Sequence, residues 1–333
     1  MPSLHERPAK RPRLKPLELV EDVKESTVKL GEVAITAFVH WLTLRAGFIT
    51  IDSMLNAPQL LDLVGAKYIS YLYVRHIPKY LALRTLTALG RLKPSIRRLM
   101  PLSWRIIDRW CSEEPCVHHK PIPHMIFRAV VAIALGWGWD SFAAIVIITY
   151  FGPGRVGEPL RQCRRDLVLP SDVLDFCRPA AYLCIRRPKT AKRGGAAAQT
   201  VQIEGDLEIQ FLEEFARSLA PGSPLSPLSV PSFRKQWDRI LTTALGIPAK
   251  HGFLPSGLRG GGAVHQFTDL KLDIATLQYR MRIKDQQTLR HYLQEAITMS
   301  TLIELSSESK TNIVAAQTFY EPLLSSYRNP AVK

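Results

Sequence analysis

The sequence has few acidic residues for its length, and this shortage sets its charge. Against 44 lysines and arginines it has 29 aspartates and glutamates, which gives a formal net charge of +15 and an isoelectric point near 9.8. A cation excess of this size is typical of a protein that binds a polyanion, with nucleic acid as the first candidate and an anionic membrane as the second. No segment has the clean basic amphipathic pattern that membrane-surface binding requires, so no membrane partner is expected.

Cysteine is also scarce, and the five cysteines form no pattern. They are odd in number and scattered, and no secretory signal is apparent ahead of them, so we expect free thiols in a reducing, intracellular compartment. Cys111, Cys116, His118 and His119 form one tight group of potential zinc ligands. No second ligand pair lies nearby at the spacing of a structural zinc site, so a proline-containing loop is the better interpretation and no metal is expected.

A long uninterrupted apolar run is missing as well. Residues 129–151 come closest to the length of a membrane span, but Asp140 lies at the centre and residues 136–139 look like a break between two shorter segments. Two buried helices of a globular domain explain this stretch better. With 333 residues, 46% of them hydrophobic, the chain is long enough for two ordinary domains with a core in each.

Composition divides the chain into five segments. Residues 1–27 are a basic tail with almost nothing apolar to bury, so we expect disorder there. Residues 28–111 have apolar side chains at helical spacing, which predicts a helical domain. Its basic and aromatic residues, described below, make it the candidate DNA-binding domain. The proline-rich residues 112–122 predict a linker. A second domain over 123–305 and a C-terminal tail over 306–333 complete the organisation.

Two basic stretches fit a nucleic-acid partner. In the tail, Lys10-Arg11-Pro12-Arg13 resembles a nuclear import signal, although a solvated tail that touches DNA phosphates explains it equally well. Nuclear or otherwise intracellular, DNA-associated localisation is therefore expected. In the helical domain, Tyr68, Tyr71, Tyr73 and Tyr80 alternate with arginines and lysines between residues 67 and 98. Cations beside aromatic rings suit a surface that follows a phosphate backbone, but the rings could also belong to the core, and the sequence leaves both open.

The second domain is predicted to be mainly helical with a small antiparallel sheet. Residues 182–186 and 200–203 have strand-like composition and flank a turn rich in glycine, alanine and lysine, which predicts a hairpin with a basic tip. A proline- and serine-rich loop over 221–231 precedes further helices to about Leu305. The expected fold class is therefore mainly α, with a minor β component, in two domains.

Gly152-Pro153-Gly154-Arg155-Val156-Gly157 matches the glycine pattern of a dinucleotide-binding turn and follows the β-branched run 145–149. Three details oppose that interpretation. Proline and arginine occupy positions where the backbone must approach a pyrophosphate, the preceding segment is helix-length, and no convincing second strand ends in an acid about 20 residues later. A nicotinamide or flavin enzyme is therefore a weak alternative, and neither a cofactor nor a small-molecule substrate is expected.

The same turn supports a different interpretation when it is joined to two later segments. Residues 150–160 place Arg155 after a helix and a glycine turn, with Glu158 three residues later, and resemble the first arginine box of the tyrosine recombinase family. Leu258-Arg259-Gly260-Gly261-Gly262-Ala263 resembles the second arginine box, and Thr288-Leu289-Arg290-His291-Tyr292-Leu293 the tyrosine box. Arg259 and Tyr292 are 33 residues apart, about the separation that the family shows.

The predicted hairpin supplies the remaining member of the series. Lys189 sits where the family carries its catalytic lysine, with Lys192 as the alternative. The order arginine, lysine, arginine, tyrosine is more specific than any one residue. The resemblance covers residues 123 to about 305 and is to a divergent, eukaryotic mobile-element-like member, whereas residues 28–111 resemble the family's core-binding domain only in general character.

The resemblance implies a DNA integrase or recombinase that breaks and rejoins strands. Tyr292 would be the nucleophile that forms a 3′-phosphotyrosyl bond, and Arg155 and Arg259 would grip the non-bridging phosphate oxygens, which planar guanidiniums can do bidentately. Lys189 would protonate the departing 5′-oxygen as general acid, and Glu158 would support the first arginine. The resemblance also implies double-stranded DNA clamped between two domains, a homotetramer on DNA, and no metal or nucleotide.

Three positions depart from the family's pattern. Ser256 and Gly260 stand where the family often has histidines around the second arginine, and Ile283 stands where a histidine or tryptophan is expected. Serine donates hydrogen bonds but is no general base at neutral pH, and isoleucine does neither. His265, Arg280, Arg282 and His291 are the nearby residues that could compensate. The alternative function is therefore a catalytically impaired DNA-binding protein on the same scaffold.

Overall fold

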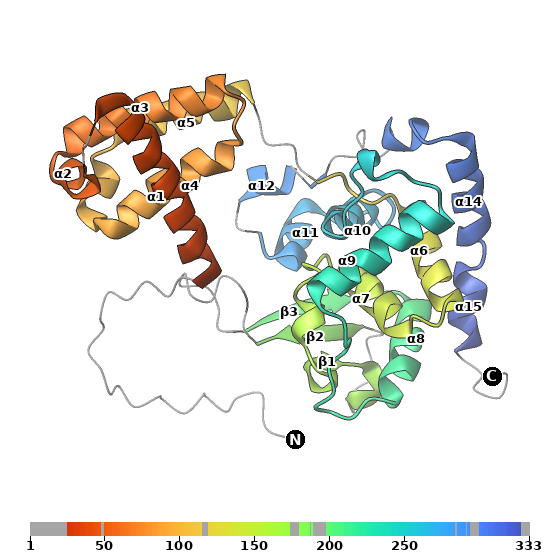
Figure 1. Cartoon of the computed structure of the whole chain (residues 1–333). Helices are drawn as coiled ribbons and strands as arrows, with labels where there is room; N and C mark the ends of the chain where they lie inside the picture. The colour runs from red at the N-terminus through yellow and green to blue at the C-terminus, as the bar shows by residue number, and fades with distance from the viewer. Residues whose placement is uncertain are drawn as a thin grey trace, which may run out of the picture. The chain divides into compact units, whose positions relative to one another are not determined.

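The chain forms two compact units, which divide between Val117 and His118, inside the segment expected to be a linker. The computed structural model describes residues 25–327 apart from 48–49, 115–118, 174–179, 187, 189–197, 284, 291 and 294–299 (Figure 1). Most of the expected basic tail, including Lys10 to Arg13, lies outside the described residues.

Unit 1 is helical throughout the residues described. Its elements are α1 (Glu25–Ala46), α2 (Ile51–Asn56), α3 (Pro58–Val74), α4 (Lys79–Leu92), the 3₁₀ turn η1 (Pro94–Arg98) and α5 (Pro101–Glu113). Helix α1 packs on α4 and α3 packs on α5, around a core that includes Phe38, Tyr68 and Leu89. Prolines begin α3 and α5, where the missing N–H would have had no helical partner.

A buried carboxylate joins α3 to α5. Asp62 accepts hydrogen bonds from the backbone N–H groups of Leu102 (2.9 Å) and Ser103 (2.8 Å), and the Ser103 hydroxyl donates to the Asp62 carbonyl (3.0 Å). The first N–H groups of a helix lack intrahelical acceptors and carry partial positive charge, so an acid from a neighbouring helix stabilises them. This contact fixes how the two helices align.

Unit 2 combines helices with one small sheet. Its helices are α6 (His124–Gly136), α7 (Asp140–Phe151), α8 (Asp206–Arg217), α9 (Val230–Arg239), α10 (Gly257–Thr268), α11 (Ile274–Met281), α12 (Gln286–Arg290), α14 (Ser307–Gln317) and α15 (Tyr320–Ser326). Short helical turns are η2 (Pro159–Arg161), η3 (Arg164–Asp166), η4 (Pro170–Asp172), η6 (Ile240–Ala244) and η7 (Ala249–His251). The strands are β1 (Leu167–Val168), β2 (Ala181–Ile185) and β3 (Gln199–Ile203).

Helices α6 and α7 form the centre of the unit 2 core. Every residue of α7 from Phe142 to Phe151 is buried, and most of α6 is buried too. A helix that is apolar on all sides must be covered on all sides, and these two are contacted by α8, α10, α14, α15 and β3. The expected pair of helices is confirmed, with the break at Gly138, whose φ of +69° suits glycine. None of the described helices has the length and apolarity needed to cross a membrane.

The predicted hairpin strands pair as expected, and a third strand joins them. β2 lies antiparallel between β1 and β3, with Leu183 opposite both Leu167 and Val201. Alternate β2 residues Ala181, Leu183 and Ile185 are buried, as a half-buried strand requires. Two residues are too few to give β1 a sequence pattern, which is why it was not predicted.

The assignment of residues 306–333 to a C-terminal tail is wrong. α14 and α15 occupy most of this segment and pack on α6, and they form one side of unit 2 in Figure 1. Ile313, Tyr320 and Leu324 are buried in the unit 2 core. Burial of these three apolar side chains offsets the weak apolar periodicity of a mostly polar sequence.

Candidate functional site

A pocket in unit 2 with a volume of about 600 Å³ collects residues from widely separated segments. Its lining includes His119, Arg155, Arg234, Ser256, Arg259, Gly260, Thr288 and Tyr292. Three of the four residues expected to act on a phosphodiester are therefore brought together. The fourth, Lys189, and its alternative Lys192 lie outside the described residues, as does His291.

Arg155 reaches the pocket from the turn that ends α7. Gly152 follows the last helical residue, and a Cβ there would overlap Val201 of β3, so only glycine lets the sheet approach the helix end. Because this turn follows a helix and not a strand, the dinucleotide interpretation of the glycine pattern is wrong. The Arg155 side chain is about half exposed (48%), so its guanidinium is accessible from the pocket.

Glu158 holds this turn in place through buried hydrogen bonds. It is only 2% exposed, and it accepts hydrogen bonds from the backbone N–H of Arg155 (3.0 Å) and from the Arg155 guanidinium (3.2 Å). Burial by itself would raise the pKa of Glu158, but Arg282 and then the Arg155 backbone N–H hold it below its ordinary value. The carboxyl is therefore ionised at neutral pH and holds Arg155 in place.

The run of glycines in α10 allows close helix packing. A Cβ at Gly257 or Gly261 would overlap the carbonyl oxygens of Lys120 and Ile122, and one at Gly262 would overlap the carbonyl oxygen of Tyr150 in α7. Segment 119–122 therefore lies directly against the start of α10, where the Ile122 N–H donates to the Gly257 carbonyl (3.1 Å). Through this packing His119 lines the same pocket as Arg259.

Arg259 is the most deeply buried cation of the pocket, at 4% exposure. Its Nη2 donates to the Met281 carbonyl (2.5 Å), whereas its Nε and Nη1 are buried without a hydrogen-bond partner among the described residues. Burial and the nearby Arg155 lower the pKa of Arg259 to about 10, which leaves it cationic at neutral pH. Buried donors without acceptors are costly, so this guanidinium is prepared for an anion.

Tyr292 lies beside this arginine. Its ring centroid is 5.3 Å from Cζ of Arg259, a cation–π distance, and its backbone N–H donates to the Leu289 carbonyl (2.8 Å). The ring packs against the small cluster formed by Ala263, Leu277, Met281 and Leu289. Helix packing therefore fixes the position of the ring, which also lines the pocket.

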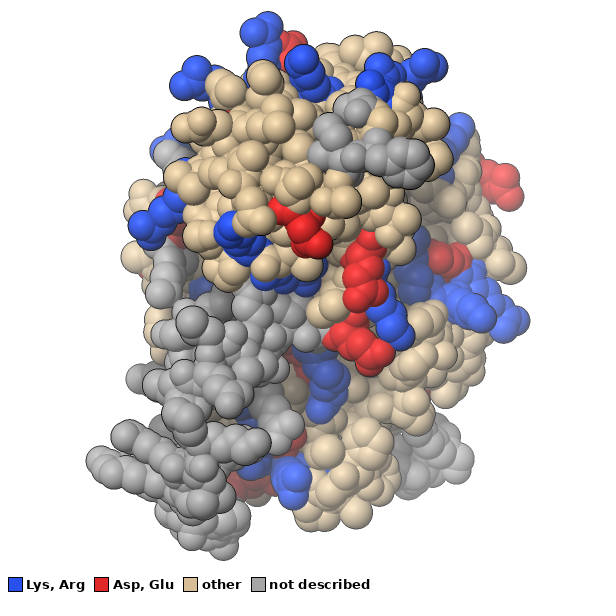
Figure 2. All heavy atoms as spheres, turned by 60° about the vertical axis from the view of Figure 1, so that its left-hand side comes forward, with Lys and Arg blue, Asp and Glu red and all other residues tan. Residues whose placement is uncertain are grey.

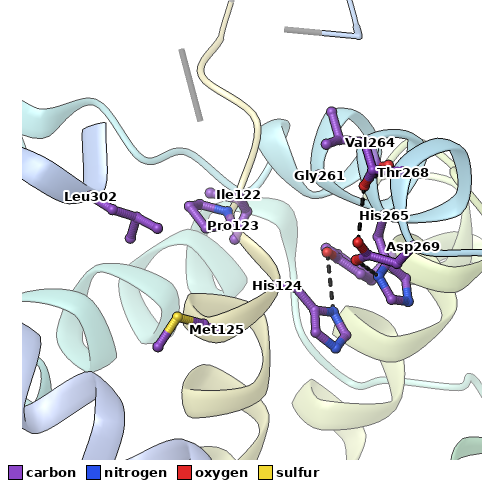
Figure 3. Close-up of a pocket in the computed structure, with 11 residues that line it drawn as sticks. Ile122, Pro123, His124, Met125, Gly261, Val264, His265, Thr268, Asp269 and Leu302 are labelled. Atoms are coloured by element: carbon purple, nitrogen blue, oxygen red, sulfur yellow. Dashed lines mark hydrogen bonds and ion pairs between the residues drawn. The ribbon is translucent and has the colours of Figure 1, made fainter. Parts of the chain in front are cut away.

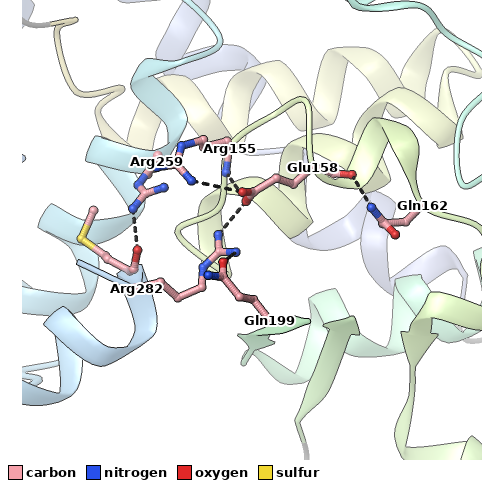
Figure 4. Close-up of polar contacts among 7 residues, drawn as sticks. Arg155, Glu158, Gln162, Gln199, Arg259 and Arg282 are labelled. Atoms are coloured by element: carbon pink, nitrogen blue, oxygen red, sulfur yellow. Dashed lines mark hydrogen bonds and ion pairs between the residues drawn. The ribbon is translucent and has the colours of Figure 1, made fainter. Parts of the chain in front are cut away.

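A third arginine, which the sequence placed only among possible compensating residues, completes the polar cluster. Arg282 Nη2 donates to Glu158 (2.6 Å), and Nη1 donates to Gln199 of β3 (2.9 Å). Figure 4 shows Glu158 between Arg155 and Arg282, with Arg259 beside Arg155. Three guanidiniums against one carboxylate leave an excess of two positive charges in this cluster.

The three positions that depart from the family pattern lie in different surroundings. Ser256 is exposed and lines the pocket together with Gly260. Ile283 packs against the apolar cluster beside Tyr292 and is not part of the pocket lining. His119 was not predicted for this site, because nothing in its local sequence links it to residues that lie more than 30 positions away. Among the described residues no group of histidines, cysteines and acids could hold a metal, and Cys116 and His118 lie outside them.

A second, smaller pocket of about 190 Å³ is lined by residues of α6 and by Gly261, Val264, His265 and Thr268 of α10 (Figure 3). The His124 and His265 rings stack there at 4.1 Å and 5° between planes, His265 pairs with Asp269 (2.6 Å), and His124 hydrogen-bonds with Tyr150 (3.3 Å). Burial, then His265 and Arg128, lower the pKa of His124 to about 4. The stack is therefore uncharged on the His124 side at neutral pH and ties α6 to α10.

Unit 1 resolves the alternatives left open for its aromatic residues. Tyr68 is core, whereas Tyr80 is exposed beneath Arg84 (4.9 Å) and Tyr71 lies between Arg45 (4.9 Å) and Arg75 (5.8 Å). Figure 2 shows lysine and arginine side chains at several separate places on the visible face, with acidic side chains among them.

Comparison with known proteins gives the fold. No protein-family model matches the sequence, and no curated protein matches it either. Among solved structures, the integrase of transposon Tn1549 bound to transposon right end DNA superposes with a TM-score of 0.51 at 13% identity, over 86% of this chain and 95% of that one.

Two further structures were matched. The Tn1549 integrase with circular intermediate DNA gives 0.49 at 10% identity over 82% and 99% of the chains, and XerA recombinase gives 0.36 at 16% over 85% and 94%. The expected fold class, mainly helical with a small antiparallel sheet, is confirmed, and the match to the Tn1549 integrase bound to right end DNA shows that the chain shares the fold of that integrase.

Proposed function

We propose that this protein cleaves and rejoins DNA strands as a site-specific recombinase or integrase. The observation that carries the proposal is the buried guanidinium of Arg259. Two of its nitrogens have no hydrogen-bond partner among the described residues, and it lies against the Tyr292 ring in a pocket that Arg155 also lines. A cationic pocket of this kind suits an oxyanion, and a tyrosine beside it suits a nucleophile.

The proposed reaction exchanges one phosphodiester for another. The Tyr292 hydroxyl loses its proton to solvent as its oxygen attacks phosphorus, the bond from phosphorus to the 5′-oxygen breaks, and a 3′-phosphotyrosyl bond remains. Arg155 and Arg259 hold the non-bridging oxygens, whose negative charge grows in the transition state, and Glu158 positions Arg155. Lys189 delivers the proton that the departing 5′-oxygen needs. A 5′-hydroxyl from another strand reverses the step and releases Tyr292.

The partners follow from the same proposal. The substrate is double-stranded DNA, which the net charge of +15 favours, and the Tn1549 integrase of like fold was solved with DNA. Residues 28–111 bind DNA, and so does a catalytic domain that comprises 123–305 together with segment 119–122 and helices α14 and α15, which pack against it. A homotetramer on DNA, a mobile-element origin and a nuclear location complete the proposal.

Covalent trapping on DNA tests this function. The substrates are a library of duplexes with a nick placed close to the cleavage position. After cleavage the short fragment that carries the 5′-hydroxyl diffuses away, so a phosphotyrosyl adduct accumulates. The adduct runs as a shifted band in a denaturing gel. Wild type should form the adduct, and Tyr292→Phe should not, because it lacks only the attacking oxygen. Tyr279→Phe, at an exposed tyrosine outside the pocket, is the matched control and should trap normally. Absence of adduct from wild type across the library would rule the proposal out.

A second function, DNA binding without strand cleavage, is favoured by Ile283. This side chain packs with Leu277, Met281 and Leu289, where the family pattern expects a residue that can hydrogen-bond. In that case duplex binding persists and no adduct forms. The double variant Ser256→His, Ile283→His then tests the cause. It should form adduct if the absence of histidines at these two positions abolished cleavage, and it should form none if cleavage is absent for another reason.

A further inference from the structure

The backbone of Arg282 has an unfavourable conformation for a residue with a side chain. It ends α11 with φ 57° and ψ 42°, the left-handed region that glycine adopts freely and other residues occupy at a cost. A glycine would serve this helix end better by backbone criteria alone. The contacts of the arginine side chain therefore have to offset this backbone cost.

Those contacts converge on the acid that holds Arg155. The Arg282 side chain is 11% exposed and donates to Glu158, which is almost fully buried and also accepts from Arg155. Its other terminal nitrogen donates to Gln199, the first residue of β3. Arg282 thus joins α11, the Arg155 turn and the base of the hairpin at one carboxylate (Figure 4).

The charge balance gives this contact a consequence for the pocket. With Arg155 as its only cationic partner, the buried Glu158 carboxylate would neutralise that guanidinium. Because Arg282 supplies a second cation from the side away from solvent, one positive charge offsets Glu158 and the charge of Arg155 stays available in the pocket.

We propose that Arg282 is a positioning residue, which neutralises and orients Glu158 so that Arg155 presents a full positive charge to a phosphate group in the pocket. Arg282 itself does not touch the phosphate, since it is not part of the pocket lining. The inference deepens the proposed function, because it names a residue that prepares the same phosphate site.

This role can be tested without DNA cleavage by titration calorimetry, which measures the binding of inorganic phosphate to the full chain. Arg282→Gly removes the side chain and relieves the left-handed backbone, and it should weaken phosphate binding roughly 10-fold. Arg282→Lys keeps the charge but cannot bridge Glu158 and Gln199, so it should restore part of the affinity. Arg280→Gln is the matched control, because Arg280 lies near the same end of α11 and also forms an ion pair, with Glu204 (2.6 and 2.9 Å) in place of Glu158. It should lower the melting temperature but change phosphate affinity less than about 2-fold.

A double-mutant cycle separates action through Glu158 from direct action on the anion. In a Glu158→Gln background, Arg282→Gly should change phosphate affinity less than about 2-fold, since there is no carboxylate left to neutralise. An equal loss in both backgrounds, phosphate binding unaffected by Arg282→Gly, or no phosphate binding by wild type would overturn the inference. Failure of wild type to trap DNA, with the phosphate results as expected, would remove the proposed function and leave the role of Arg282 intact.

Discussion

Arg259 is buried as deeply as residues of the hydrophobic core, yet two of its three guanidinium nitrogens have no acceptor among the described residues. Removing a charge from water costs several kcal/mol, and a single carbonyl contact offsets only part of this. Such an arrangement is retained where a ligand supplies the missing acceptors. Cζ of Arg259 lies 5.3 Å from the centroid of the Tyr292 ring, so an anion bound by Arg259 would lie close to Tyr292.

At the same scale, the stability of unit 2 should depend on pH through His124. Its pKa is about 4 in the folded protein, so between the ordinary histidine value and pH 4 the unfolded chain takes up a proton that the folded chain does not. The contribution of His124 to stability is therefore constant above pH 6.5 and falls as the pH drops towards 4, by about 3 kcal/mol over the window. Urea unfolding at several pH values measures this loss.

His124→Gln provides the control for that measurement. Glutamine does not titrate, so the variant should lose much less stability than wild type between pH 6.5 and 4. The depressed pKa of Asp269, where burial is outweighed by the hydrogen bond from His265, adds a loss of stability as the pH falls towards and below its ordinary value of 3.8. Wild type and variant share this loss. Equal slopes for wild type and variant would contradict the assignment to His124.

At the scale of elements, α10 determines the shape of the site. It carries Arg259 at its first turn, while Gly257, Gly261 and Gly262 lie against segment 119–122 and α7 with no room for side chains. Because α7 leads directly into the Arg155 turn, the α7–α10 packing distance sets the separation of the two arginines.

Gly262→Ala should disrupt this packing. The new Cβ would overlap the Tyr150 carbonyl, so α10 must move away from α7, at a cost of about 1–3 kcal/mol in unfolding free energy. Phosphate affinity should fall along with stability, since the two arginines separate. Gly136→Ala, where a Cβ meets nothing within 4 Å, is the control and should leave stability unchanged or raise it by about 0.5 kcal/mol. If Gly262→Ala unfolds at the wild-type urea concentration, the close approach is not required.

At the scale of the whole molecule, the charge of +15 should dominate DNA affinity. If about six to ten phosphates are neutralised, binding of a labelled duplex should weaken roughly 10³- to 10⁵-fold between about 50 and 200 mM salt. Fluorescence anisotropy over a salt series measures the slope. Tyr292→Phe, which removes no charge, should give the same slope as wild type, and an affinity independent of salt would contradict a phosphate-directed interface.

Much of the fold was predictable, because the signals are local. Apolar periodicity gave the helices of both units, and strand-like composition on either side of a glycine-rich turn gave the β2–β3 hairpin. The C-terminal helices were missed, because α14 buries only a narrow stripe, with Ser309 and Ile313 facing the core. Their docking depends on α6, nearly 180 residues earlier, which no local pattern reveals.

The sequence by itself determined the charge of the protein, its helical character and the order of Arg155, Arg259 and Tyr292 along the chain. Each of these depends on composition or on spacing between residues close enough for a motif to be recognised. Only the tertiary structure decided that Arg282 shares Glu158 with Arg155 and that His119 borders the pocket, because these contacts join residues 36 to 140 positions apart. Long-range packing of α7, α10 and α11 creates such contacts, and it leaves no periodic trace in any of the segments it joins.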